Sequence, residues 1–272
     1  MLLPPNWPAL PLDVQEAYLK ALRQAPPGLT VAEAKEFALK IVGQVMGMIQ
    51  TPLGSRLKLL AYLGVEEADL LDPLRFDRKF WPDSRLYDKQ EQIVLSVEQD
   101  DEVYVPAGNM LGKDYVAGRI ALSFFLRKRL LGKTVRIITT SVKDDHLRVL
   151  WGEMGRFLLT SKKPLDVKHG GPLAVNHRDI RWKWPGDECM ISYLRGMVSE
   201  KGEGMAGHHA EETLVIVDEA SGVDDLVYTQ CDTWAKRKLL IGNPMPTQNF
   251  FFKAVKAGDV VAADDPAVRG PA

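Results

Sequence analysis

Val103–Asp114, with the sequence V-Y-V-P-A-G-N-M-L-G-K-D, decides the fold of this chain. It places a short apolar strand, then a loop with glycines, then a lysine where a helix begins. Backbone N–H groups of such a loop can wrap phosphate oxygens, and the lysine supplies positive charge. The stretch therefore predicts a phosphate-binding loop. Its candidate nucleotide contacts are Ala107, Gly108, Asn109, Met110, Leu111, Gly112, Lys113 and Asp114.

The loop departs at two positions from the usual pattern, which is a glycine, four free positions and then Gly-Lys-Ser/Thr. Ala107 stands at the first glycine, although Gly108 beside it still supplies backbone freedom. Asp114 replaces the hydroxyl that normally touches Mg²⁺. A carboxylate can meet Mg²⁺ directly or through water, but it also brings negative charge near the phosphates. Taken alone, the loop leaves an ordinary strand-to-helix turn as the alternative.

A second motif, Leu214–Ser221 (L-V-I-V-D-E-A-S), ends an apolar strand in two carboxylates. Ligands of α/β proteins bind at the carboxyl edge of the sheet, where Asp218 and Glu219 are expected to lie. One short acid would be enough to cap a helix, whereas two adjacent acids suit a metal ion and a water molecule. We assign Asp218 to the Mg²⁺ shell and Glu219 to the general base. With Lys113, which would meet the β- and γ-phosphates, they predict a site that hydrolyses ATP with Mg²⁺.

Strand and helix patterns alternate from about Phe80 onward. The strands expected are Glu102–Val105, Val135–Thr139, Ile180–Trp184, Cys189–Tyr193, Thr213–Val217 and Lys238–Ile241, and the helices are Asp83–Val97, Lys113–Leu130, Val142–Leu159 and Asp225–Trp234. Ile180–Trp184 and Cys189–Tyr193 are expected to form a hairpin across residues 185–187. The alternation predicts an α/β fold, a P-loop NTPase of the ASCE or RecA-like type, with a mostly parallel sheet flanked by helices.

By pattern the chain divides into three parts. Residues 1–79 are expected to be a helical N-terminal region, with helices over Leu12–Gln24 and Val31–Ile49. Residues 80–258 are the expected ATPase domain. Residues 259–272 are expected to be a linker or tail, because they are rich in Ala, Asp and Pro.

Composition narrows the class of protein. The 272 residues are 46% apolar and 26% charged, as in ordinary globular domains, and the net charge of −1 limits any nucleic-acid contact to local basic patches. Cys189 and Cys231 are too distant in sequence for metal-ligand spacing or a disulfide framework, which favours a reducing cytosol. No apolar run approaches the ~18 residues of a membrane span, and Met1–Pro8 does not have the pattern of a secretory signal.

The order of the motifs between Arg85 and Lys256 resembles the ATPase domain of the large terminase subunit of tailed phages, the motor that packages DNA into capsids. The motifs that carry the resemblance, besides the loop and the acidic strand, are Leu86–Gln92, Thr139–Ser141, Ala206–His209 and Leu239–Pro244. It implies that Gln90 contacts adenine and that Asn243, at a strand tip, senses the γ-phosphate. The alternatives are that Gln90 is an exposed helix residue and that Asn243 lies in a plain turn.

The resemblance implies an ATP-hydrolysing motor that moves double-stranded DNA into a viral capsid. Its expected partners are further copies of itself in a ring, the phage portal and the small terminase subunit, in the host cytoplasm. A related nucleic-acid-dependent ATPase or helicase, and a nucleotide-binding assembly module with little turnover, are the alternatives. Ring motors often take an arginine from a neighbouring subunit; Arg148 and Arg195 are the candidates, with Arg148 preferred. Full large terminases carry a nuclease domain, which is not expected within these residues, so no nuclease activity is expected.

Several side chains outside these motifs have plainer interpretations. The basic cluster Arg127–Arg129 with Lys133 is expected to be a solvated helix end, and Lys162, Lys163, Lys168 and His169 form a second cluster that could follow a DNA backbone. His208 and His209 do not have metal-ligand spacing and are expected to be loop residues, with a sensing role left open. Trp182 and Trp184 share one strand face and are expected to pack in the core.

Overall fold

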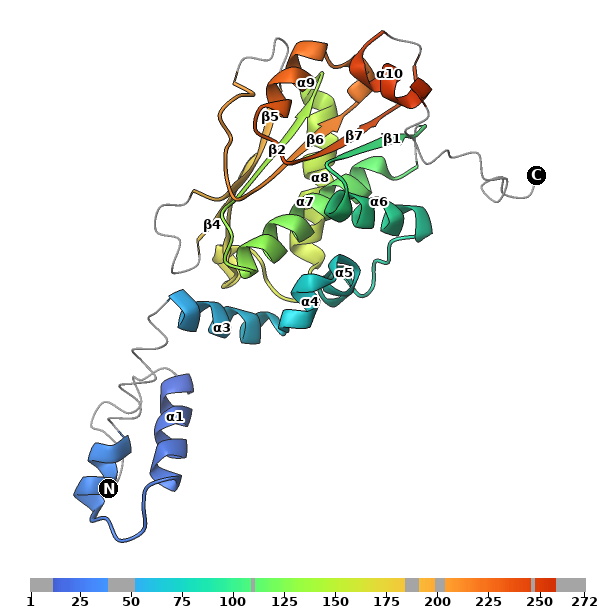
Figure 1. Cartoon of the computed structure of the whole chain (residues 1–272). Helices are drawn as coiled ribbons and strands as arrows, with labels where there is room; N and C mark the ends of the chain where they lie inside the picture. Colours follow the sequence, from blue (N-terminus) through green and yellow to red (C-terminus); the bar gives the residue numbers. More distant parts are fainter. Residues whose placement is uncertain are drawn as a thin grey trace. The chain divides into compact units, whose positions relative to one another are not determined.

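The computed structural model describes residues 12–38, 52–108, 111–183, 191–198, 204–245 and 248–257. They fall in two compact units, Met1–Tyr62 and Leu63–Ala272. The first unit contains α1 (Leu12–Arg23), a helix over residues 31–38, and α3 (Pro52–Leu63), which ends at the boundary (Figure 1). Thr30 caps the helix over 31–38, since its Oγ1 accepts from the N–H of Glu33 while the Glu33 carboxylate accepts from the N–H of Thr30. The rest of the helix expected over Val31–Ile49 lies outside the described residues.

In the described part of the second unit, seven strands form one sheet in the order β1-β7-β6-β2-β5-β4-β3. The strands are β1 (Glu102–Pro106), β2 (Val135–Ser141), β3 (Leu173–Asn176), β4 (Asp179–Trp182), β5 (Tyr193–Val198), β6 (Glu212–Asp218) and β7 (Arg237–Gly242). The pairs from β1 through β7, β6 and β2 to β5 are parallel, whereas β4 pairs antiparallel with both β5 and β3. The prediction of a mostly parallel α/β sheet is confirmed.

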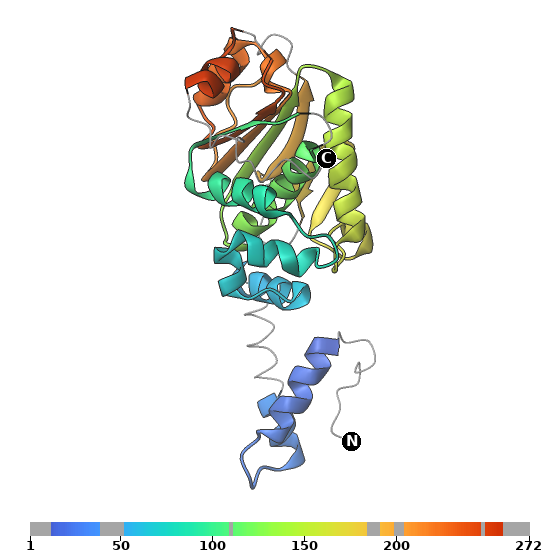
Figure 2. The same cartoon turned by 90° about the vertical axis from the view of Figure 1, so that its right-hand side faces the viewer.

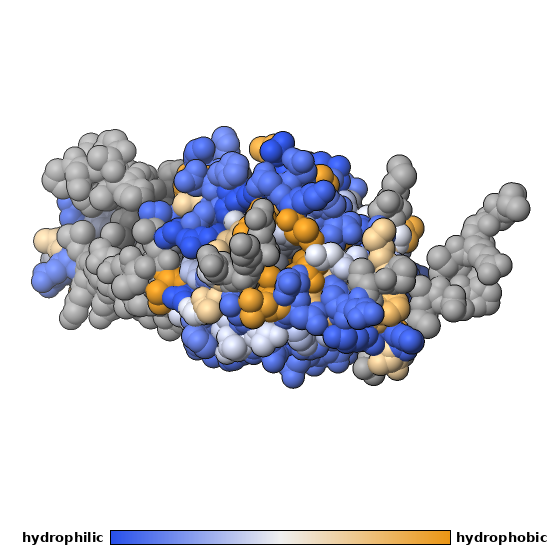
Figure 3. All heavy atoms as spheres, turned by 90° about the horizontal axis from the view of Figure 1, so that it is seen from above, coloured by the Kyte–Doolittle hydropathy of each residue, from blue (hydrophilic) through white to orange (hydrophobic). Residues whose placement is uncertain are grey.

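Helices cover both faces of this sheet (Figures 1 and 2). One face carries α6 (Asp88–Gln99), α7 (Lys113–Leu130) and α8 (Asp144–Thr160), and the other carries α9 (Asp225–Asp232) and α10 (Phe250–Ala257). Strand β6 is therefore buried on both sides, and each of its residues from Leu214 to Val217 is at most 1% exposed. The surface seen in Figure 3 is mainly hydrophilic, with apolar residues in small groups.

Some elements differ from the expectation. The helix expected from Asp83 begins at Asp88, because Ser84 bonds to α7 through its side chain and its carbonyl. Besides β3, the helices α4 (Glu67–Leu71), α5 (Pro73–Phe80) and α10 were not expected, and α4 and α5 belong to the compact unit of the sheet. Strand β5 begins at Tyr193, where the expected strand Cys189–Tyr193 ends; the expected turn lies outside the described residues.

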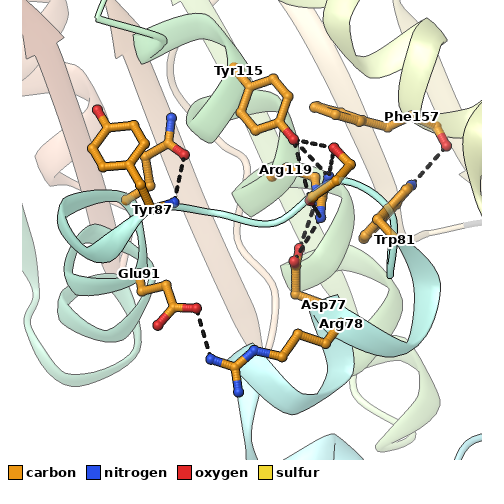
Figure 4. A network of polar contacts seen from close by, with 10 residues as sticks. Asp77, Arg78, Trp81, Tyr87, Glu91, Tyr115, Arg119 and Phe157 are labelled. Atoms are coloured by element: carbon orange, nitrogen blue, oxygen red, sulfur yellow. Dashed lines mark hydrogen bonds and ion pairs between the residues drawn. The ribbon is translucent and has the colours of Figure 1, made fainter.

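A buried ion pair joins α5 to α7 (Figure 4). Arg119 is fully buried, and its guanidinium donates from Nε and Nη2 to the two carboxylate oxygens of Asp77 at 2.8 and 2.7 Å. The same group donates to the Ser84 carbonyl at 2.9 Å and lies 4.4 Å from the ring centroid of Trp81. The Trp81 indole in turn donates to the Phe157 carbonyl of α8 at 2.9 Å. One side chain thus fixes α5, α7 and the segment between α5 and α6.

The basic end of α7 is not the solvated end that was expected. Arg127 is only 2% exposed, donates to the Leu70 carbonyl of α4 at 2.9 Å and pairs with Glu98 of α6, whose other oxygen is 2.9 Å from Lys128 Nζ. Burial lowers the pKa of Arg127 to about 10 and that of Lys128 to about 8. Trp182 packs in the core as expected, and its ring centroid lies 5.2 Å from the guanidinium carbon of Arg129. Trp184 lies outside the described residues.

Replacing Arg119 by methionine should lower the free energy of unfolding by about 3–5 kcal/mol, because it leaves Asp77 buried without its partner. Urea unfolding followed by circular dichroism measures the loss. Arg78→Met is the matched control, since Arg78 is 58% exposed in its pair with Glu91 and an exposed pair contributes about 0–1 kcal/mol. Equal losses in the two variants would contradict the central role of Arg119.

Candidate functional site

The predicted motifs meet at the carboxyl edge of the parallel strands. In the strand register, Ser141 at the end of β2 lies beside Asp218 at the end of β6, and Pro106 at the end of β1 lies beside Gly242 at the end of β7. Strand β7 separates β1 from β6. The loop that follows β1 and the two acids at the end of β6 therefore flank the tip of β7.

The tip of β7 is in close contact with both neighbours. The Gly242 carbonyl accepts a hydrogen bond from the Ala107 N–H at 3.0 Å, which holds the start of the predicted loop. A Cβ atom added to Gly242 would lie 2.9 Å from the backbone nitrogen of Ala220, so only glycine lets the chain after the acidic pair cross here. Asn243 follows at once and is half-buried. Its assignment as a γ-phosphate sensor stays a prediction.

Lys113 is the first residue of α7, and Gly112 before it has the left-handed φ of +72°. The lysine side chain is only 7% exposed, and its Nζ lies 2.7 Å from Oε1 of Glu219. The structure thus brings together the predicted phosphate-binding lysine and the predicted general base. Asn109 and Met110 of the loop lie outside the described residues, and Gly108 is exposed.

The N-terminus of α6 holds the far side of the loop. Gln90 is 4% exposed; its Nε2 donates to the Gly112 carbonyl and its Oε1 accepts from the Tyr87 N–H, both at 3.4 Å. The Tyr87 hydroxyl donates to the Leu111 carbonyl at 2.9 Å. The adenine contact expected of Gln90 stays a prediction, and in this structure its amide is used on the loop itself.

A pocket of about 250 Å³ opens beside the lysine. It is lined by Asp114, Asp145, His146, Val149, Asp218 and Glu219. Glu219 has φ +50° and ψ +46°, a left-handed conformation that costs a non-glycine residue about 1–2 kcal/mol. Its N–H donates to its neighbour Asp218 at 2.9 Å, and the turn directs its carboxylate to Lys113. Backbone strain of this kind is typical of functional sites.

His146 is a pocket residue that the sequence interpretation did not assign. Its Nδ1 lies 3.9 Å from the same Oε1 of Glu219 that Lys113 contacts. The available signal was its position: it lies in the first turn of α8, directly after β2 ends at the same sheet edge. The first turn of α8 thus places His146 near the carboxyl ends of β2 and β6, where ligands of α/β proteins bind.

The charges of the pocket suit a divalent cation. Asp218 is 4% exposed, and burial, together with the nearby carboxylates of Asp114 and Glu219, raises its pKa to about 7. Burial also raises the pKa of Asp114, although the positive charge of Lys113 acts to lower it. Among the described residues, no three His, Cys, Asp or Glu side chains form a metal site by themselves. In phosphate sites, Mg²⁺ is bound by one or two carboxylates together with phosphate oxygens and water. Asp218 and Asp114 can supply the carboxylates.

Neither candidate arginine lines this pocket, although Arg148 pairs at 3.6 Å with Asp145, which does. Arg148 is 72% exposed on α8 and pairs with Asp144 at 3.3 Å, while Arg195 on β5 donates to Asp179 at 3.0 Å. Their assignment to a neighbouring active site stays a prediction. His208 is a packed residue, because its Nδ1 is 2.6 Å from the Tyr193 hydroxyl and its Nε2 is 3.0 Å from the Gly204 carbonyl. Burial lowers its pKa.

Comparison with solved structures finds the HK97 bacteriophage large terminase, with a TM-score of 0.50 and 16% sequence identity. The match covers 70% of this chain and 42% of the HK97 chain, so the present chain spans less than half of that protein. Over the matched part, the fold is that of the HK97 large terminase. The ATPase domain of the Thermus phage P74-26 large terminase matches at a TM-score of 0.41 and 14% identity, over 62% of this chain and 74% of that one. The sequence matches no protein-family model and no curated protein.

Replacing Asp218 by asparagine should change how stability depends on pH. Between the ordinary aspartate pKa of 3.8 and the raised value of about 7, the folded chain keeps a proton that the unfolded chain loses. The contribution of Asp218 to the free energy of unfolding therefore falls as pH rises through this window. Asp218→Asn should gain stability relative to wild type across the same window, and the difference should level off above it.

Urea unfolding at a series of pH values, without Mg²⁺ or nucleotide, measures this difference. Asp145→Asn is the control, because it removes a carboxylate from the same pocket at a side chain that is 83% exposed. Parallel profiles for wild type and Asp218→Asn would show that Asp218 does not titrate abnormally.

Proposed function

We propose that this chain hydrolyses ATP and acts as the motor domain that drives double-stranded DNA into a viral capsid. The observation that carries the hydrolytic part is that Lys113 contacts Glu219, which lines one pocket together with Asp218 at the carboxyl edge of the sheet. The large-terminase fold supports the packaging part. The proposal includes three partners, which are further copies of the chain in a ring, the portal and the small terminase subunit. It places the chain in the host cytoplasm. No described helix is long and apolar enough to cross a membrane.

In the proposed site, the backbone at the start of α7 and the ammonium group of Lys113 bind the β- and γ-phosphates. Asp218 would hold Mg²⁺ directly or through water, and Asp114 would add a second carboxylate where related loops have a hydroxyl. When bound, Mg²⁺ neutralises part of the phosphate charge. Asp218 would bind the cation as a carboxylate at neutral pH, although burial and the neighbouring carboxylates raise its pKa.

Glu219 is the general base of the proposed reaction. It takes a proton from the water that attacks the γ-phosphorus, while the bond from that phosphorus to the β–γ bridging oxygen breaks and ADP departs. Its Oε1 contacts Lys113 at 2.7 Å, so the carboxylate would be freed for this role when phosphate oxygens become the partners of the lysine. Asn243 at the β7 tip is the proposed γ-phosphate sensor, and Arg148 is the arginine proposed to act on a neighbouring subunit. No nuclease activity is proposed for this chain.

Glu219→Gln should lower the turnover number for ATP by about 10²–10⁴-fold, the usual contribution of a positioned general base. Binding of ATP should persist, because the lysine and the loop are unchanged. Phosphate release measures turnover, and calorimetric titration measures binding. Asp145→Asn, which removes a different pocket carboxylate, should keep turnover within about threefold of wild type, since Asp145 is solvated. Equal turnover in wild type and Glu219→Gln would refute the hydrolytic assignment.

Asp114 supports a second candidate function, a nucleotide-binding assembly module with little turnover, because its carboxylate lies beside the proposed phosphate site. Asp114→Ser restores the usual loop pattern. Turnover that is unchanged or rises up to about tenfold is expected if the hydroxyl replaces a tolerated carboxylate. A collapse of turnover in phosphate-release assays at saturating Mg²⁺ would instead give Asp114 a metal-binding role of its own. A wild-type chain that binds ATP and releases no phosphate would favour the assembly module.

A further inference from the structure

The two flanks of the phosphate loop differ in chemistry. On one flank lie the carboxylates of Asp218 and Glu219, which under the proposed function act at the γ-phosphate. A nucleoside triphosphate is a linear ligand, so its nucleoside must leave the loop away from that end. The other flank is formed by the N-terminus of α6, which contacts the loop through Tyr87 and Gln90.

Tyr87 presents an aromatic ring on this second flank. The residue is 52% exposed although it follows a buried leucine, Leu86, which is 8% exposed. Its position is nevertheless fixed, since its hydroxyl donates to the Leu111 carbonyl at 2.9 Å and its backbone N–H donates to Gln90. An exposed ring that is held at both ends is suited to receive a flat ligand, because little side-chain freedom remains to be lost on binding.

Gln90 has the opposite character. It is 4% exposed, and both ends of its amide are occupied, one by the Gly112 carbonyl and one by the Tyr87 N–H. A Cβ added to Gly112 would lie 3.0 Å from its Nε2, which shows how closely the amide packs on the loop. Reading a base edge would require Gln90 to leave these partners. Its place in the structure is that of a support for the loop.

We propose that Tyr87 stacks on the purine base of the bound nucleotide and that Gln90 holds the phosphate loop without reading the base edge. The chain therefore accepts GTP as well as ATP. This inference rests on the proposed nucleotide site and specifies its substrate class. Stacking on an aromatic ring tolerates different bases, because every base has a π-face, whereas a site built to hydrogen-bond one base discriminates by about 10⁴–10⁵-fold.

The test compares wild type, Tyr87→Ala and Tyr87→Phe with Tyr62→Ala, a control at a second exposed tyrosine, which lies in the other compact unit. Dissociation constants for ATP and GTP are measured by calorimetry, and KM and kcat by phosphate release. Competition by inorganic tripolyphosphate, which has no base, reports on the loop alone. The full chain is used throughout.

Wild type should bind ATP and GTP with constants that differ by less than about thirtyfold. Tyr87→Ala should weaken both by roughly 5- to 150-fold, the usual effect of removing an aromatic base stack, and kcat should hold while KM rises. Tyr87→Phe keeps the ring and should lose less than Tyr87→Ala. Tripolyphosphate binding should be the same in wild type and Tyr87→Ala, and Tyr62→Ala should match wild type in every measurement.

A wild-type preference for one nucleotide above about thirtyfold would overturn the inference, because stacking cannot supply it. An equal loss of tripolyphosphate and ATP binding in Tyr87→Ala would also overturn it, since Tyr87 would then act on the loop. Failure of hydrolysis is a separate result: nucleotide binding without turnover would refute the enzymatic proposal while the calorimetric comparison still decides the role of Tyr87. Absence of binding by both nucleotides would refute both.

Discussion

Parallel pairing of β1, β7, β6 and β2 brings four chain segments to one edge of the sheet. Strand β6 ends at Asp218 of the pocket, and the register aligns Ser141 with Asp218 and Pro106 with Gly242. A slip of one residue in any of these pairs would turn its side chains to the opposite face of the sheet. Burial on both faces opposes such a slip, because it would disturb fully buried residues such as Leu214 and Leu240. The geometry of the pocket is therefore a consequence of how the core packs.

Helix α7 connects the packed core to Lys113. Its first residue is Lys113, its middle carries Arg119 in the buried pair with Asp77, and its last turn carries Arg127 against α4 and α6. Buried charges are costly unless they are fully paired, so these contacts tolerate few alternative positions of the helix. A functional side chain on a helix held at its middle and far end is placed more accurately than one on a free loop.

Sequence alone could predict the loop, the acidic strand and the sheet, because each depends on local pattern. The run Leu214–Val217 is apolar without interruption, which indicates a strand buried on both faces, and Lys113 follows a glycine at a helix start. The pair of Arg119 and Asp77 could not be predicted, since 42 residues separate them and nothing local distinguishes Arg119 from an exposed helix arginine. The basic end of α7 was misjudged for the same reason: a solvated and a buried arginine look alike until the neighbouring helices are placed.

The site shows the same division. Asp218 and Glu219 could be assigned because adjacent acids at a strand end have few other uses, whereas His146 enters the pocket only through the crossover from β2 to α8. The left-handed turn at Glu219 is equally invisible in the sequence, because glutamate rarely adopts it and only the crowding at Gly242 and Ala220 reveals why the chain bends there. Gln90 was assigned by its place in a motif, and its burial behind the loop became known only from the structure.

The contact between Lys113 and Glu219 has a consequence for the order of events in the proposed reaction. While Oε1 of Glu219 accepts from Lys113, that oxygen is not available to a water molecule. Under the proposed function, the arriving triphosphate performs an exchange of partners in which it takes the lysine and leaves the glutamate unpaired. Binding of the triphosphate and release of Glu219 from Lys113 are then a single event. A site without bound triphosphate does not have a free general base.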